Sequence, residues 1–255
     1  MDLGIDGKVA LVMGASKGIG RACAAALARE HARVAITSRS RERIDATAQE
    51  IAADSSATVE GFVADTDEPD SMGSVVEAVE QSLGPIEILV TNTGGPPAGE
   101  SLGFDRRAWE TAYRALVLSP LALIKAVVPG MRERQWGRIV NITSASTREP
   151  ISGLILSNSH RLAAVGIFKT LATELAKDGV LFNSAAPGLI ATDRVAQLRG
   201  VPLEELTGQP APEIPIGRLG TVEEMGDVVA FLCSERASYV TGVNLLVDGG
   251  LVKAV

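Results

Sequence analysis

The chain has 255 residues, of which 46% are hydrophobic and 22% are charged, and its formal net charge is -7. This composition is typical of a globular protein and excludes a disordered or low-complexity chain. The net negative charge repels nucleic-acid phosphates, and the basic residues are scattered along the chain. We therefore expect a small-molecule ligand and no nucleic-acid partner.

The cysteine pattern and the N-terminal residues bear on the cellular compartment. Cys23 and Cys233 are isolated in apolar helical segments, without metal-ligand spacing around them. We therefore expect a reducing environment and no metal site. The first residues lack the basic and apolar regions of a secretion signal, and no apolar run reaches the roughly 18 residues that span a bilayer. We expect a cytoplasmic protein with no membrane partner.

Apolar runs and helical patterns alternate along the chain. Strands are predicted at residues 8–13, 33–38, 58–64 and 87–91, with helices at about 21–30, 41–53 and 69–83 between them. After a helical region at about 105–135, strands are predicted at 137–143, 180–186 and 242–247, with helices at about 153–176 and 221–235. This alternation implies right-handed crossovers and a parallel sheet. The sequence predicts an α/β fold: a Rossmann-type doubly wound parallel sheet of about seven strands in three layers, forming a single domain over residues 1–255.

Proline and glycine residues interrupt the chain at about 188–220, before the last predicted helix. Long segments of this kind are commonly functional loops, and such loops close over bound ligands. We expect residues 188–220 to be irregular and to act as a loop or lid over a site.

The run GASKGIG lies between the first predicted strand and the first predicted helix. Glycines at such a turn let a pyrophosphate approach the backbone, and the start of the helix supplies free amides and a partial positive charge. We expect this turn to bind a dinucleotide cofactor. Its candidate binding residues are Gly14, Ser16, Lys17, Gly18, Ile19 and Gly20.

The end of the second predicted strand bears on the choice of nucleotide. Sites for NAD usually carry an acidic residue there for the ribose 2′-hydroxyl, whereas a basic residue accommodates a 2′-phosphate. This chain has Ser38 and Arg39 at that point and no acid, and Lys17 adds a second positive charge. We expect NADP(H) to be preferred over NAD(H). Arg41 and Arg43 are as easily explained as ordinary solvated residues.

Several segments together carry a family resemblance. They are GASKGIG, VAD ending at Asp65, TNTGG at 91–95, GRIVNITS ending at Ser144, AAPGLIATD at 185–193 and the C-terminal run RLGTVEEMGDVVAFLCSERASYVTGVNLLVDGG. In these segments the chain resembles the short-chain dehydrogenase/reductase family, in particular its 3-oxoacyl-(acyl carrier protein) reductase-like members. The resemblance covers essentially the whole chain.

The resemblance implies further cofactor contacts and an oligomer. Asp65, with Thr66 beside it, would meet the adenine, and Asn92, Thr93 and Gly94 would line the cofactor ribose. Pro187, Gly188, Ile190 and Thr192 would pass beside the nicotinamide amide and the phosphates. The family usually has a pair of asparagines at the start of this segment, and this chain has Thr91 in place of the first. The resemblance also implies a homodimer or homotetramer that uses the helices near 105–135 and 157–177.

The catalytic positions depart from the family pattern. Members usually carry an asparagine, a serine, a tyrosine 13 residues after the serine and a lysine four residues later. Ser144 matches the serine, so Ser157 stands at the tyrosine position and Arg161 at the lysine position, while Leu116 falls on the asparagine position. The resemblance therefore implies a degenerate tetrad, with SxxxR in place of YxxxK.

These replacements change the available chemistry. Hydride transfer to a carbonyl creates an alkoxide that must be protonated, and a serine hydroxyl is a far weaker acid than a phenol of pKa about 10. Arg161 would still hold the nicotinamide ribose hydroxyls and add positive potential, but it stays protonated, so it cannot relay a proton. His160 shares a helix side with Ser157 and Arg161 and is our candidate for a substitute acid, the alternative being a packing or interface role. Tyr113 is a weaker candidate.

Three functions remain open at this point. The first is an NADP(H)-dependent oxidoreductase acting on a small carbonyl or alcohol substrate, with Ser144, Ser157, His160 and Arg161 at its catalytic site. The second is a non-catalytic NADP(H)-binding sensor or regulatory protein of the same fold. The third is a purely structural subunit, which leaves the glycine turn and Arg39 unexplained. We rank the oxidoreductase first because Ser144 and the cofactor loops are both present.

Overall fold

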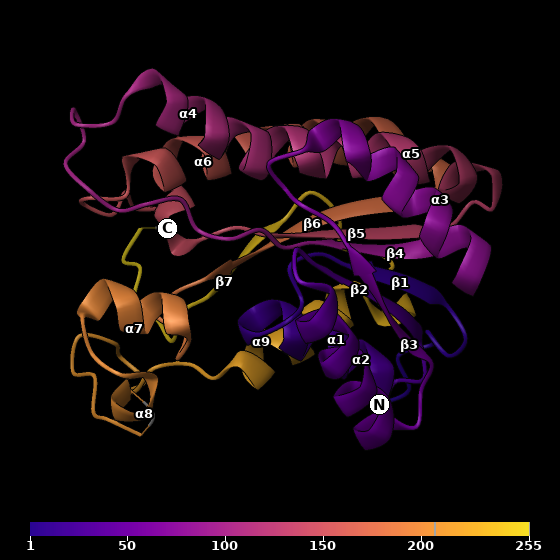
Figure 1. The fold of residues 1–255 in the computed structure, drawn as a ribbon, viewed down its shortest axis with the longest axis horizontal. Helices are drawn as coiled ribbons and strands as arrows, with labels where there is room; N and C mark the ends of the chain where they lie inside the picture. The colour runs from indigo at the N-terminus through magenta and orange to yellow at the C-terminus, as the bar shows by residue number, and fades with distance from the viewer. Residues whose placement is uncertain (207, 255) are drawn as a thin grey trace.

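The computed structural model describes residues 1–206 and 208–254, which are built around one parallel sheet of seven strands (Figure 1). The strands are β1 (Val9–Val12), β2 (Arg33–Ser38), β3 (Val59–Val63), β4 (Ile86–Thr91), β5 (Gly137–Ile142), β6 (Val180–Pro187) and β7 (Asn244–Val247). Their order is β3-β2-β1-β4-β5-β6-β7, and every neighbouring pair is parallel. The predicted doubly wound α/β sheet is confirmed.

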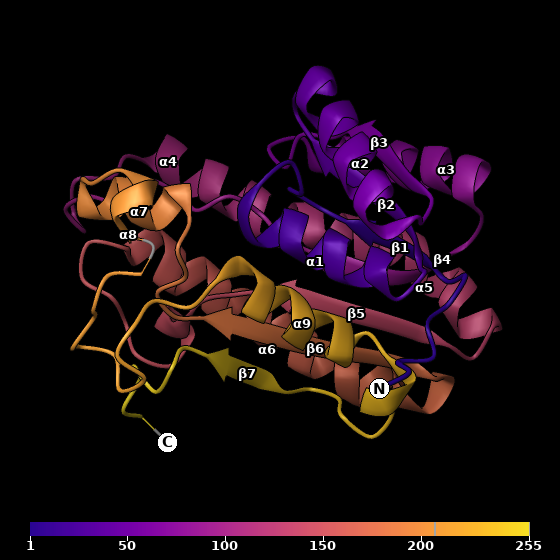
Figure 2. The same ribbon diagram turned by 90° about the horizontal axis from the view of Figure 1, so that it is seen from below.

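Helices cover both faces of this sheet (Figures 1 and 2). One face carries α1 (Gly18–Arg29), α2 (Arg41–Ser55) and α9 (Val222–Leu232). The other carries α3 (Met72–Leu83), α5 (Ser119–Glu133) and α6 (Ile155–Leu175), with α4 (Arg106–Tyr113) in the same layer. The short helices α7 (Asp193–Arg199) and α8 (Leu203–Leu206) lie beyond the end of the sheet to which the strand arrows point.

The apolar strands divide their side chains between two cores. In β1, Ala10 and Val12 belong to the core beneath α1 and α9, whereas Val9 and Leu11 belong to the core beneath α3 and α5. Successive side chains of a strand point to opposite faces, and here both faces are covered. This is why the strand sequences read as nearly continuous apolar runs.

The order of the strands reverses between β1 and β4, and we call the region at the carboxyl ends of the strands around this switch point the crevice. The chain runs outward from β1 to β3 and then resumes at β4 on the other side of β1. The turns that follow β1 and β4 are adjacent, since the Met13 amide donates to the Val90 carbonyl at 3.0 Å. Ligands of open α/β sheets bind at such a switch point.

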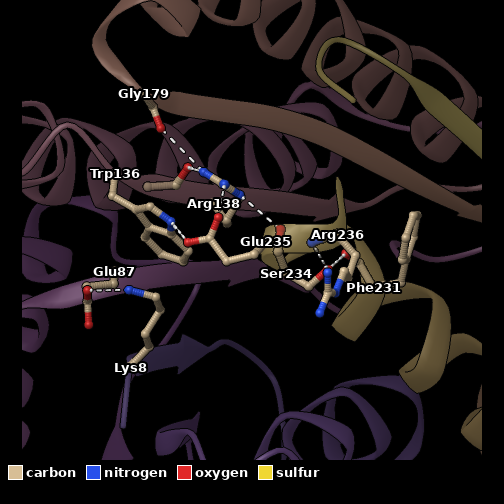
Figure 3. A network of polar contacts seen from close by, with 10 residues as sticks. Lys8, Glu87, Trp136, Arg138, Gly179, Phe231, Ser234, Glu235 and Arg236 are labelled. Carbon is tan, nitrogen blue, oxygen red and sulfur yellow. Dashed lines mark hydrogen bonds and ion pairs between the residues drawn. The ribbon is translucent and has the colours of Figure 1, made fainter. Parts of the chain in front are cut away.

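A polar network ties together the opposite, amino-terminal edge of the sheet (Figure 3). The Lys8 ammonium and the Arg138 guanidinium lie 3.9 and 4.5 Å from the centre of the Trp136 ring. Trp136 Nε1 donates to Glu235 Oε1 at 2.5 Å, and Glu235 also pairs with the buried Arg138 at 3.7 Å. These contacts join β1, β5 and the end of α9 far from the crevice, so they stabilise the fold rather than the site.

One helical stretch, Arg106–Glu133, is long and apolar enough by length and composition to cross a membrane, with a hydropathy of 1.5 over its most apolar window. In this fold the apolar residues Leu123, Ile124 and Val127 of α5 pack into the core beneath the sheet. A π-helical turn at Arg114–Leu118 separates α4 from α5. The region predicted to be helical at 105–135 is therefore helical, with one wider turn inside it.

Residues 188–220 differ from the expectation of an irregular segment. They contain the helices α7 and α8, and six of their residues bury themselves in a small apolar cluster. The members of this cluster are Val195, Ala196, Leu206, Ala211, Ile214 and Leu219. The prediction missed these two helices because the frequent prolines and glycines are typical of turns, and the apolar stretches between them are too short to indicate a helix.

Candidate active site

The glycine turn after β1 is shaped by its own backbone. Gly14 and Gly18 adopt φ values of +56° and +59°, which favour glycine. The Asn92 side chain donates to the carbonyls of Gly14 at 3.0 Å and Met13 at 3.3 Å, so β4 holds the turn in place. A Cβ atom at Gly20 would collide with the Gly14 carbonyl oxygen. The turn therefore has a fixed form that side chains at its glycines would destroy.

The start of α1 is open to an anionic group. Lys17 is the N-cap residue but its side chain makes no capping bond, and the first turn of α1 contains no acidic residue. A Cβ atom built at Gly94, across the crevice, would meet no atom within 4 Å. Unpaired amides at a helix start attract anions, so the geometry fits the diphosphate of a dinucleotide. Ser16 and Ile19 belong to this turn, and Ile19 packs partly into the core.

The two basic residues expected at a 2′-phosphate differ in their surroundings. Arg39 is exposed directly after β2, and its guanidinium has no hydrogen-bond or ion-pair partner among residues 1–206 and 208–254. Lys17 is exposed too, but its ammonium pairs with Asp193 Oδ2 at 2.5 Å. Arg41 is engaged with Asp45 and with the Gly61 carbonyl. Among the described residues, the structure therefore leaves Arg39 free and ties Lys17 to the first residue of α7.

The residues expected near adenine and ribose follow β3 and β4. The Asp65 carboxylate accepts from the Asp67 amide at 3.0 Å, and the Thr66 carbonyl accepts from Ser119 Oγ at 2.7 Å. Thr93 is buried beside the exposed Gly94. Thr91 donates its hydroxyl hydrogen to Asn141 Oδ1 at 3.0 Å, so the departure at this position supplies a bond between β4 and β5.

The chain after β6 forms the other wall of the crevice. Pro187 ends β6, Gly188 packs against Asp248, and Ile190 pairs with Gly220 in an isolated parallel bridge. Thr192 caps α7 by accepting from the Val195 amide at 3.4 Å. A Cβ atom at Gly18 would lie 3.8 Å from the Thr192 methyl carbon, so this wall approaches the glycine turn closely.

Ser157 and Arg161 form a buried pair in the first two turns of α6. Arg161 Nε donates to Ser157 Oγ at 3.2 Å, and Arg161 Nη1 donates to the Ile142 carbonyl at the end of β5 at 2.7 Å. Ser144 lies two residues after Ile142, and its Oγ accepts a hydrogen bond from the Ser146 amide at 3.1 Å. Burial, and to a smaller extent the charge of Arg194, lower the pKa of Arg161 to about 10.

His160 has a different set of neighbours. Its Nδ1 lies 2.7 Å from the Leu156 carbonyl oxygen, and its ring centre lies 5.5 Å from that of Trp109 and 6.0 Å from that of Tyr113 on α4. None of these contacts involves Ser144, Ser157 or Arg161. The contacts are those of a residue that packs α6 against α4, and the role of His160 as an acid stays a prediction.

Leu116 occupies the π-helical turn between α4 and α5 and is buried. A π turn inserts one residue into the helix, and such turns are frequent at functional sites. Here the turn presents an aliphatic side chain at the position where the family pattern has an asparagine. No amide group is therefore available at this position to hold a water.

The sequence reasoning missed Arg194. Its Nη2 donates to the Pro96 carbonyl at 2.5 Å, so α7 is connected to the turn after β4. A Cβ atom at Gly95 would lie 2.8 Å from Arg194 Nε, and burial lowers the pKa of Arg194. The only signal in the sequence was a basic residue two positions after Thr192. Ser146, whose buried hydroxyl has no partner in the part of the chain described, was missed as well.

Comparison with known proteins gives consistent matches over this whole architecture. The family model described as enoyl-(acyl carrier protein) reductase matches residues 14–252. The chain is 36% identical over 251 residues to the 3-oxoacyl-(acyl-carrier-protein) reductase FabG of Aquifex aeolicus, covering 98% of this chain and 100% of that protein.

Solved structures agree with these matches. L-sorbose reductase from Gluconobacter frateurii, complexed with NADPH and L-sorbose, is 32% identical with a TM-score of 0.91 and full coverage of both chains. YwfH, an NADPH-dependent reductase involved in bacilysin biosynthesis, is 28% identical with a TM-score of 0.89 over 97% of this chain and 99% of that one. From the sheet, the glycine turn and these matches together, we conclude that the chain belongs to the short-chain dehydrogenase/reductase family of oxidoreductase enzymes.

Proposed function

We propose that the protein is an NADP(H)-dependent oxidoreductase that transfers a hydride between nicotinamide and a carbonyl or alcohol substrate, without the family's phenolic acid. The observation that carries this proposal is the backbone cradle at the start of α1, which lies at the same carboxyl-terminal edge of the parallel sheet as Ser144 and the Ser157–Arg161 pair bonded to the end of β5. The similarity to reductases that are described with NADPH supports it.

The proposed preference for NADP(H) over NAD(H) rests on Arg39. An exposed guanidinium without a partner, at the end of β2, is free to pair with a 2′-phosphate by two parallel hydrogen bonds. Lys17 would join this contact only after leaving Asp193, its present partner. We therefore assign the larger share of the selectivity to Arg39.

Hydroxyl groups and one cation would perform the chemistry on the protein side. The bound nicotinamide supplies or accepts the hydride. Ser144 and Ser157 donate hydrogen bonds to the substrate oxygen, and Arg161 donates through Nε to Ser157 Oγ, which directs the Ser157 proton away from Arg161. The buried charge of Arg161 stabilises the negative charge that develops on the substrate oxygen. Because a serine is too weak an acid to be the final source, the proton comes from water through Ser157.

The remaining expectations are carried as part of the same proposal. We propose that residues 1–255 act as one domain in the cytoplasm, that residues 188–220 serve as the lid, and that copies of the chain associate through α4, α5 and α6. Tyr113 and Leu162, on α4 and α6, are 46% and 54% exposed, which leaves apolar surface on these helices for a second copy.

The first test is a titration of the purified protein with NADPH and, separately, NADH. The titration should follow the increase in nicotinamide fluorescence rather than energy transfer from tryptophan. Trp136 lies at the amino-terminal edge of the sheet, opposite the edge that carries the glycine turn. We expect NADPH to bind more tightly than NADH. The absence of binding by either would refute the proposal, and tight binding with no turnover of any carbonyl compound would favour the sensor.

A second test separates the possible acids. Ser157→Ala should lower kcat by about 10²- to 10³-fold, by analogy with the loss of one oxyanion donor, while leaving the Kd for NADPH unchanged. Thr170→Ala, farther along α6 and bonded to the Gly166 carbonyl, is the matched control and should retain activity. His160→Ala should change kcat less than threefold if the residue only packs α6 against α4. A loss as large as that of Ser157→Ala would instead make His160 the acid.

A further inference from the structure

We propose that Arg161 and Arg194 together form an anion subsite next to the substrate oxygen, and that the substrate is a short oxo acid whose carboxylate binds there. The inference rests on the proposed function and deepens it by naming a substrate class. In the reaction, the hydride goes to the carbonyl carbon, a proton from water goes to the carbonyl oxygen, and the carboxylate is unchanged.

The first observation is that both guanidinium groups lack an acidic partner. No carboxylate within the described residues lies within 4.0 Å of either Arg161 or Arg194. Arg161 is 8% exposed and Arg194 is half-buried. Charged residues are rarely removed from water without a partner, because the loss of hydration is unfavourable. The missing partner is therefore a negative charge that the chain itself does not provide.

The second observation is that the two groups are held by separate segments, both at the carboxyl ends of the strands. Arg161 is fixed on α6 by its bonds to Ser157 and to the Ile142 carbonyl. Arg194 is fixed on α7 by its bond to the Pro96 carbonyl in the turn after β4. Arg161 is therefore bonded to the end of β5 and Arg194 to the turn after the neighbouring strand β4, and the charge of Arg194 contributes to lowering the pKa of Arg161. Like charges held together in this way define a place for an anion.

The third observation concerns the hydrogen-bond donors that remain. A guanidinium has five N–H groups in one plane. Arg161 uses N–H groups for its bonds to Ser157 and Ile142, and Arg194 uses one for its bond to Pro96. All three acceptors are carbonyl or hydroxyl oxygens. The arrangement leaves donors for a carboxylate, which guanidinium groups bind by paired hydrogen bonds.

The position of Arg161 determines what kind of anion fits. The cofactor diphosphate would lie at the start of α1, where the glycine turn and the free amides are. Arg161 contacts Ser157 directly, and Ser157 is one of the two hydroxyls proposed to hold the substrate oxygen. An anion bound to Arg161 and Arg194 is therefore on the substrate side. A substrate that reaches both groups carries its carboxylate close to its carbonyl, as 2-oxo and 3-oxo acids do.

The test compares an acid with its neutral ester on the whole protein with NADPH. The probes are 2-oxobutanoate and 3-oxobutanoate, each beside its methyl ester. We expect kcat/KM for at least one acid to exceed that of its ester at least tenfold. Arg194→Gln should reduce kcat/KM for the acid at least tenfold and for the ester less than twofold, and Arg194→Lys should recover part of the loss.

A matched control and a binding measurement separate this proposal from its alternatives. Arg199→Gln removes the same charge from the same helix, where Arg199 pairs with Glu213, and should leave the acid-to-ester ratio unchanged. Thermal unfolding verifies that each variant is folded. If Arg194→Gln weakens NADPH binding tenfold and leaves the acid-to-ester ratio intact, Arg194 binds a cofactor phosphate and the proposal is wrong. Equal rates on acids and esters also overturn it.

The failure of this inference is distinguishable from that of the proposed function. Where no probe is reduced, calorimetric titration of the NADPH complex with 3-oxobutanoate decides the matter. Binding that Arg194→Gln abolishes supports the anion subsite. No binding to a complex that does hold NADPH overturns the subsite alone, whereas a protein that does not bind NADPH overturns both.

Discussion

The two walls of the crevice are built by different means. The wall formed by the turns after β1 and β4 consists of main chain, with glycines at its closest approaches and Asn92 bonded to two carbonyls. The wall formed by β5, α6 and α7 consists of side chains, among them Ser144, Ser157 and Arg161. The first wall depends on the path of the main chain, whereas the second depends on the identities of its side chains.

The contrast shows which parts of such a site are free to change. A cradle of backbone amides depends on the path of the chain, so a single added methyl group disrupts it. A corner made of side chains keeps its framework when one side chain replaces another, as the bond from Arg161 to Ser157 illustrates. Side chains of the second wall can therefore be exchanged while the first wall keeps its form.

The largest effect is expected in the backbone-built wall. In Gly20→Ala the new Cβ would meet the Gly14 carbonyl and lie 2.7 Å from Asn92 Nδ2, which breaks the bond that holds the turn. We expect the Kd for NADPH to rise about 100-fold, equivalent to about 2.7 kcal/mol. Overpacking should also lower the free energy of unfolding by about 1–3 kcal/mol. Fluorescence titration and chemical denaturation measure the two quantities.

Gly73→Ala is the control for this substitution. A Cβ atom at Gly73, at the start of α3, would meet nothing within 4 Å. The variant should bind NADPH as the parent does and unfold at the same or a slightly higher denaturant concentration. Unchanged NADPH binding by Gly20→Ala would mean that the cradle is not the cofactor site.

An intermediate effect is expected at Arg39, the side chain to which we assign the preference for NADPH over NADH. Arg39→Ala removes the free guanidinium at the end of β2 and should weaken NADPH binding about 10- to 100-fold, because a charge-assisted phosphate contact is lost. NADH lacks the 2′-phosphate, so its Kd should change less than twofold. Arg43→Ala, one turn into α2 and also exposed, should leave both values unchanged. An equal effect of Arg39→Ala on both nucleotides would remove Arg39 from the selectivity.

The smallest effect is expected at the ion pair that joins the two walls. Lys17 and Asp193 have side chains that are 66% and 54% exposed, and exposed pairs contribute little, so Asp193→Asn should change the free energy of unfolding by less than about 0.5 kcal/mol. The released Lys17 should tighten NADPH binding by roughly two- to fivefold. Asp227→Asn, which breaks the equally exposed pair with Arg29, is the control. Weaker NADPH binding in Asp193→Asn would show that the pair assists the cofactor instead of competing with it.

Much of the framework was predictable because its signals are local. Apolar runs such as KVALVM and GRIVNIT mark buried strands, and each predicted strand lies within two residues of an observed one. The glycine turn was recognisable from its place between a strand and a helix. The helices α7 and α8 were missed because each is too short to show a periodic pattern, and their apolar residues pack in a small cluster separate from the two main cores.

The sequence by itself determined the sheet, the turn that the glycines require and the identities at the catalytic positions, because these follow from local patterns and spacing. Only the tertiary structure decided which of the polar residues meet. The spacing put Ser157, His160 and Arg161 on one side of a helix, yet the fold directs His160 to α4 and Arg161 to β5. Arg194 reaches Pro96, and Lys17 reaches Asp193, across long stretches of chain. Such contacts depend on how distant segments pack, and no local pattern in the chain records them.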